Sequence, residues 1–111
     1  MNLIDYLKRQ IEWSGRTFGY SPRAVGITRH IERELIEIRA APRDLTEWVD
    51  VVILALDGAW RAGYTAEQIA DALGMKQADN MVRDWPPVGS CKDDEPTEHI
   101  RVPNNSITGA R

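Results

Sequence analysis

The sequence predicts an all-α domain built as a four-helix bundle. Apolar residues recur at three- to four-residue spacing in four separate stretches, which is the period of a helix with one buried face. Capping residues, glycines and prolines separate these stretches, and no part of the chain gives a convincing strand pattern. The chain has 111 residues, which is enough for one core of ordinary size but not for two.

The N-terminal part of the chain predicts one helix followed by a long loop. A helix from about Leu3 to Trp13 is expected after Asn2, which suits the capping position. Residues 14–26 contain three glycines and one proline without a helical or strand period, so we expect a loop there. Loops of this length are often functional.

A second helix and a tight turn are expected next. The helix begins after a Thr28 cap and runs to about Ala40. Its expected core face is formed by Ile31, Leu35 and Ile38. Residues 41–43 form the break, because Pro42 disfavours helix at the residue before it.

The third expected helix, from a capping Asp44 to about Ala62, is apolar almost all round. Such a helix lies centrally in a bundle or between subunits. A fourth helix is expected after a Thr65 cap and reaches about Asp84, where Trp85 and two prolines stop it.

Composition excludes several classes of protein. Apolar residues make up 42% and charged residues 28%, as in a globular protein, and we expect a helical domain over 1–86 with an irregular tail over 87–111. The longest apolar run, 51–56, is too short to span a membrane, and no secretory signal is readable. A single cysteine, Cys91, excludes a disulfide framework and fits a cytoplasmic location. The net charge of −3 argues against nucleic acid as a partner.

Two pairs of acidic residues stand at helical spacing on either side of the turn. Glu34 and Glu37 lie on the second helix, and Glu47 and Asp50 lie on the third. Both Glu37 with Glu47 and Glu34 with Asp50 are centred on Pro42. An antiparallel hairpin about that residue therefore places the four acids in two facing levels, about 4.5 Å apart along the helix.

Four carboxylates beside a core repel one another unless cations neutralise them. Mg²⁺ or Mn²⁺, which prefer oxygen ligands and also bind phosphate, would suit this set. The alternative reading is that each acid is solvated or paired with a neighbouring arginine.

Further polar residues extend the predicted site. Asp57 pairs with Arg61 at i, i+4 or contributes to the site, and His30 packs or contacts substrate. The fourth helix turns from apolar to cationic along one face. Lys76 and Arg83 on that face could bind phosphate oxygens, and Asn80 could donate or accept a hydrogen bond beside them.

At these residues the chain resembles the MazG-like family of all-α nucleoside triphosphate pyrophosphohydrolases. The E-x-x-E and E-x-x-D motifs of that family stand here at 34–37 and 47–50, and a Lys…Asn motif stands at 76–80. The stretch 13–85 is similar to a short, often phage-encoded branch of dATP/dGTP pyrophosphohydrolases. The spacer 38–46 is shorter than in much of the family, and the match weakens after residue 85.

The resemblance implies hydrolysis of a dATP- or dGTP-like triphosphate to the monophosphate and pyrophosphate. Two or three Mg²⁺ (or Mn²⁺) ions would be held by all four acids, with Glu34 and Glu37 catalytic and Glu37 taking the proton of the attacking water. Lys76 and Arg83 would steady the outgoing pyrophosphate, and Trp85 or the 14–26 loop would hold the base or sugar.

The apolar third helix implies a homo-oligomer, because one chain cannot bury all of its surface. The family resemblance implies the same, as a dimer or tetramer with sites near subunit interfaces. The competing hypothesis is a non-catalytic helical interaction module whose acidic face is merely solvated.

Overall fold

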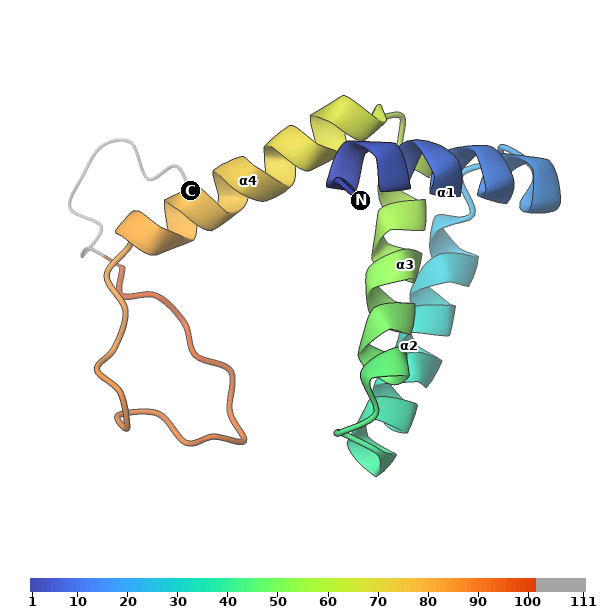
Figure 1. Ribbon diagram of the computed structural model, residues 1–111. Helices are drawn as coiled ribbons and strands as arrows, with labels where there is room; N and C mark the ends of the chain where they lie inside the picture. The colour runs from blue at the N-terminus through green and yellow to red at the C-terminus, as the bar shows by residue number, and fades with distance from the viewer. Residues whose placement is uncertain (102–111) are drawn as a thin grey trace. The chain divides into compact units, whose positions relative to one another are not determined.

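A computed structural model describes residues 1–101 of the chain, and all of its regular structure there is helical (Figure 1). The four helices are α1 (Leu3–Phe18), α2 (Ala24–Ala40), α3 (Leu45–Arg61) and α4 (Ala66–Val82). No strand occurs within residues 1–101, which confirms the all-α class. The chain divides into two compact units, Met1–Gly74 and the residues from Met75 onward.

Helices α2 and α3 form an antiparallel hairpin, with the two helices side by side along their length (Figure 1). The turn between them is closed by the amide of Asp44, which donates to the carbonyl of Ala41 at 3.0 Å. The Asp44 side chain then caps α3 by accepting from the amide of Thr46 at 3.0 Å. The Trp48 indole donates to the carbonyl of Pro42 at 2.9 Å and ties α3 back onto the turn.

Helix α1 crosses the hairpin at the C-terminal half of α3 (Figure 1). Its buried positions are Leu7, Gln10 and Ser14, at helical spacing, and the Gln10 amide donates to the carbonyl of Ile53 at 2.9 Å. Leu7 is fully buried in a small core with Ala66 and Ile69 from the start of α4. Side chains at the edge of this core come from α1 and α3.

Two helix boundaries differ from the sequence prediction. Helix α1 continues through Phe18 instead of ending at Trp13. The prediction of a loop over residues 14–26 is therefore wrong, and only residues 19–23 connect the first two helices. Ser14 and Gly15 are both buried in α1, where neighbouring segments pack against them. Tertiary contacts outweigh the low helix propensity of serine and glycine there.

Helix α2 begins four residues earlier than its predicted cap. Thr28 lies inside the helix, where its hydroxyl donates to the carbonyl of Ala24 at 2.9 Å instead of capping an amide. The residue before the helix is Arg23, with a left-handed φ of 53° and no side-chain cap.

The inward face of α2 is also rotated from the predicted one. Ile27 and Ile38 are buried, but Leu35 is 41% exposed and Glu34 is buried in its place. The core-face prediction for Leu35 is therefore wrong, because the hairpin turns an acidic residue toward α3.

Helix α3 packs against both α1 and α2, as the prediction of a central helix required. It nevertheless keeps a large exposed apolar surface. We call this surface the outer face of α3, and its residues are Leu45, Trp48, Val49, Val52 and Ile53.

Helix α4 begins with the predicted reciprocal cap, in which the Thr65 amide donates to the Gln68 side chain and the Gln68 amide donates to the Thr65 hydroxyl. The helix ends at Val82, two residues before the predicted end. Residues 87–101 contain no helix or strand, and the remainder of the predicted tail, 102–111, lies outside the described residues. The domain division at residue 86 stays a prediction. Within residues 1–101, none of the helices combines the length and apolarity needed to cross a membrane.

The small core makes Leu7 a sensitive position. We expect Leu7→Ala to lower the free energy of unfolding by about 2–5 kcal/mol, because a fully buried side chain is lost and a cavity remains. Urea denaturation followed by circular dichroism measures this change. Leu73→Ala is the matched control, since Leu73 is 56% exposed. Equal destabilisation by the two substitutions would show that Leu7 contributes no more to the core than an exposed leucine does.

Candidate active site

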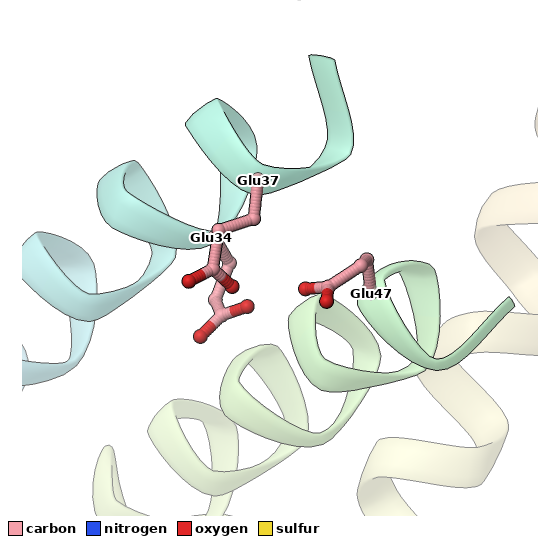
Figure 2. A group of neighbouring side chains, drawn as sticks. All are labelled: Glu34, Glu37 and Glu47. Carbon is pink, nitrogen blue, oxygen red and sulfur yellow. The ribbon is translucent and has the colours of Figure 1, made fainter. Parts of the chain in front are cut away.

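Three glutamates converge between α2 and α3 near the turn of the hairpin. Figure 2 shows the side chains of Glu34 and Glu37 on α2 and of Glu47 on α3, with their carboxylates pointing toward one another. One carboxylate oxygen from each lies within 4.8 Å of the other two. The hairpin about Pro42 thus brings Glu37 and Glu47 together, as the spacing predicts, with Glu34 beside them.

This cluster contains carboxylate oxygens that no protein group satisfies. One oxygen of Glu34 and one of Glu47, the Oε2 atom in each, are buried without a hydrogen-bond partner. Buried polar atoms are normally paired, and an unpaired one needs an explanation such as a bound ion.

The three carboxyl groups of the cluster are too close together for all of them to ionise easily. Interaction with the Glu37 carboxyl, together with burial and the nearby Glu34, raises the pKa of Glu47 to about 7. The pKa of Glu34 is also raised, first by the Glu37 carboxyl, then by burial and by the charges of Glu37 and Asp50. The causes are thus hydrogen bonding between carboxyl groups, burial and neighbouring negative charge, and a cation at this position would favour the ionised carboxylates.

The donor set suits a hard divalent cation. It offers only oxygen atoms, from a buried, a half-buried and an exposed carboxylate, and Mg²⁺ and Mn²⁺ prefer such ligands. Asp50 is exposed and lies outside the three-residue group, although its charge reaches Glu34. Its role as a fourth ligand stays a prediction.

His30 connects the acid cluster to a cavity. Its Nε2 atom lies 3.2 Å from Oε1 of Glu34, and the same side chain lines a cavity of about 370 Å³. The cavity is mainly apolar, with walls from α1, α2 and α3 that include Trp13, Phe18, Ile27, Ile53 and Leu54. Polar groups at its surface include Gln10, Ser14 and Asp57. A cavity of this size and character suits an organic ligand with a few polar groups.

A family model described as dATP/dGTP pyrophosphohydrolase matches residues 6–106, which is most of the chain. The chain belongs to the dATP/dGTP pyrophosphohydrolase family. This family match confirms the resemblance seen in the sequence. The protein is therefore an enzyme that hydrolyses a phosphoric anhydride, and the hypothesis of a non-catalytic interaction module is disfavoured. Among curated proteins and among solved structures, no significant match to the chain was found.

In this pyrophosphohydrolase, Asp57 makes the predicted i, i+4 pair and also lines the cavity. Its Oδ2 atom accepts from Nε of Arg61 at 2.9 Å, and its Oδ1 atom accepts from the Trp60 indole at 2.7 Å. Burial alone would raise the pKa of Asp57, but hydrogen bonds from Ser14, Trp60 and Arg61 together hold it below its usual value. The two readings left open by the sequence are thus compatible.

The remaining predicted site residues of the pyrophosphohydrolase lie in the second unit. Lys76 is exposed on α4, and the Arg83 guanidinium donates to the Asn80 side chain at 3.1 Å. The Trp85 indole donates to the carbonyl of Asn80 at 2.6 Å and meets His99 edge to face, with ring centroids 5.8 Å apart. Their contact with substrate stays a prediction.

Sequence reasoning missed several residues around these sites. Gln10 and Ser14 line the cavity from α1, and their i, i+3, i+7 spacing from Leu7 was the available signal. His99 falls in the predicted tail, where no periodicity indicates that it lies against Trp85. Burial, and then the positive charges of Arg101, Arg83 and Lys76, lower the pKa of His99, so these cations lie near His99 in the second unit.

The raised pKa of Glu47 predicts a pH-dependent stability when divalent cations are removed. Between the ordinary glutamate pKa of 4.5 and the raised pKa of about 7, the native state binds more protons than the unfolded chain. The free energy of unfolding should therefore fall as the pH rises through this window, because stability from the protonated carboxyl is lost. Urea denaturation in EDTA from about pH 5 to about pH 8 measures the slope.

Glu47→Gln should flatten this slope, since the amide does not titrate. Glu67→Gln is the matched control, because the Lys8 side chain 3.0 Å away lowers the pKa of Glu67 and moves its titration below the window. Identical slopes in wild type and Glu47→Gln would show that Glu47 does not hold this proton.

Proposed function

We propose that this enzyme cleaves a purine deoxynucleoside triphosphate, dGTP or dATP, to the monophosphate and pyrophosphate with the help of Mg²⁺ or Mn²⁺. The observation that carries the proposal is the convergence of three carboxylates, two of them with unsatisfied buried oxygens, in a chain of this family. A triphosphate brings the cations that such a cluster needs, and the cluster supplies the negative charge that those cations need.

The acidic residues divide into ligands and a base in this proposal. Glu34, Glu47 and Asp50 would hold two or three ions, and Glu37 would share in holding them or accept the proton of the attacking water. Glu37 is suited to that second role because it is the exposed member of the cluster. When bound, the divalent cations would neutralise the charge of the phosphates and lower the pKa of the attacking water.

The proposed reaction displaces pyrophosphate from the α-phosphorus. Water attacks that phosphorus, its proton passes to a carboxylate of the cluster, and the bond to the bridging α–β oxygen breaks. Lys76 and Asn80 on α4 and Arg83 just after it would bind the leaving pyrophosphate, because they supply two cations and an amide.

The cavity beside His30 is the proposed place for the nucleoside. Trp13 and Phe18 offer aromatic rings for a purine, and they already meet edge to face with centroids 5.5 Å apart. His30 would lie between nucleoside and phosphates, and Asp57 would offer a hydrogen-bond acceptor. A contact of Trp85 with the base or sugar is proposed from the family resemblance alone. We place the enzyme in the cytoplasm, where deoxynucleoside triphosphates and Mg²⁺ are available.

We also propose that the enzyme is a homo-oligomer, a dimer or tetramer. The outer face of α3 leaves Trp48 and Val52 about half exposed, at 51% and 55%, beside further apolar residues. A contiguous apolar surface of this kind is typical of a protein interface. A second copy of the same face would cover it with two-fold symmetry.

The reaction is tested by measuring release of pyrophosphate from a panel of dNTPs and NTPs with Mg²⁺ or Mn²⁺. We expect turnover of dGTP or dATP, abolished by EDTA, and a fall in kcat of about a hundredfold or more in Glu37→Gln. Glu32→Gln is the matched control, since Glu32 is exposed on the same helix but outside the cluster. Full activity in Glu37→Gln, or intact nucleotides with both metals, would overturn the proposal.

Val52→Glu tests the oligomer. Light scattering after gel filtration should give a multiple of the chain mass for wild type and a smaller particle for the variant, because a charge in the interface is left desolvated. Val88→Glu, a change of the same kind on an exposed residue after α4, should leave the mass unchanged. A monomeric wild-type protein would contradict the proposed interface.

A further inference from the structure

Arg61, at the end of α3, is buried and makes five hydrogen bonds. Its Nε donates to Asp57 at 2.9 Å, and its Nη1 donates to the carbonyls of Gly19 at 2.7 Å and Ser21 at 2.9 Å. Its Nη2 donates to the Ser14 hydroxyl at 2.9 Å and approaches the Ser14 carbonyl at 3.5 Å. A guanidinium has five N–H donors, so every donor is directed at a protein acceptor.

These bonds join three segments that are far apart in sequence: the end of α3, the end of α1 and the 19–23 connection. Two of the acceptors are carbonyls in that connection, which has no regular structure of its own. Its backbone is left-handed at Gly19, with φ of 84°, and at Arg23, with φ of 53°. Backbone of this kind persists where surrounding contacts determine it.

The 19–23 connection, which Arg61 holds, adjoins the wall of the cavity. Phe18 and Arg23, the residues on either side of 19–22, both line the cavity, and the Arg23 guanidinium lies 5.2 Å from the centre of the Phe18 ring. Ser14 and Asp57, two partners of Arg61, line it as well. Arg61 itself does not, because its side chain has no exposed surface.

We propose that Arg61 is a positioning residue that sets the wall of the nucleoside cavity without touching the nucleotide. The inference rests on the proposed function, since it assumes that the nucleoside occupies this cavity. Asp57 makes the arrangement possible by balancing the buried positive charge with a carboxylate that stays ionised.

Arg61 is far from the phosphate chemistry. It is fourteen residues after Glu47 on the same helix, which corresponds to about 21 Å along the axis. A change at Arg61 should therefore weaken nucleoside binding and leave the reacting groups in place.

Arg61→Lys is the decisive variant, because it keeps the positive charge and loses the planar fork. We expect the KM for the best dNTP to rise about tenfold or more, and kcat to change less than about threefold. Arg16→Lys, at an exposed arginine in the last turn of α1, is the matched control and should change neither constant.

A second measurement separates positioning from loss of folded protein. Calorimetric titration should show weaker binding of dGMP and dAMP by Arg61→Lys, whereas inhibition by inorganic pyrophosphate should be unchanged. Partial unfolding would instead reduce the active fraction and kcat, with KM and both binding constants preserved. An unchanged KM, or equal weakening of monophosphate and pyrophosphate binding, overturns the proposal.

Two further outcomes keep the test decisive. Should Arg61→Lys fail to fold, Ser14→Ala removes one acceptor of Arg61, together with the Ser14 bond to Asp57, and should raise KM about two- to fivefold, with kcat preserved. A wild-type protein that turns over no nucleotide would defeat the proposed function. Monophosphate binding that Arg61→Lys weakens would still support the positioning role, and no monophosphate binding by wild type would overturn it.

Discussion

Mutual repulsion of carboxylates is the constraint on which the first unit of this protein depends. The hairpin brings Glu34, Glu37 and Glu47 together beside buried surface, and the raised pKa values of Glu34 and Glu47 express the resulting cost. The hairpin must therefore be held by other contacts. The Asp44 cap and the bond from Trp48 to the turn hold it at the acidic end. The Arg61 hydrogen bonds hold the opposite end.

Hydrogen bonding of the buried polar groups distinguishes the residues that hold the fold together from those of the candidate site. Gln10, Ser14, Asp57 and Arg61 are buried, and each forms hydrogen bonds that join α1 to α3 or to the connection after α1. Glu34 and Glu47 instead keep buried oxygens without partners. Polar groups that complete their bonds within the chain rigidify it, whereas groups that remain incomplete are prepared for a ligand. Helix α3 carries both kinds, with Glu47 in its first turn and Arg61 in its last.

The acidic part of the site was predictable because it depends on local arithmetic. Helical spacing and one proline turn determine which carboxylates face one another, and the sequence contains both. The cavity was not predictable in the same way. Its walls come from three helices, and Ser14 and Phe18 fall in a stretch whose serine and glycine residues indicate a loop. His99 beside Trp85 depends on the path of an irregular segment, which has no period to read.

The sequence by itself determined the all-α class, the reciprocal Thr65 cap, the hairpin about Pro42 and the meeting of Glu37 with Glu47, because each is set by residues within a few turns of one another. Only the tertiary structure decided the length of α1 and the rotation of α2. Helix α1 extends to Phe18 because Arg61, from a distant helix, bonds to Ser14 and to the connection beyond. Glu34 is buried in place of Leu35 because packing against α3, and not the periodicity of α2 alone, selects the inward face.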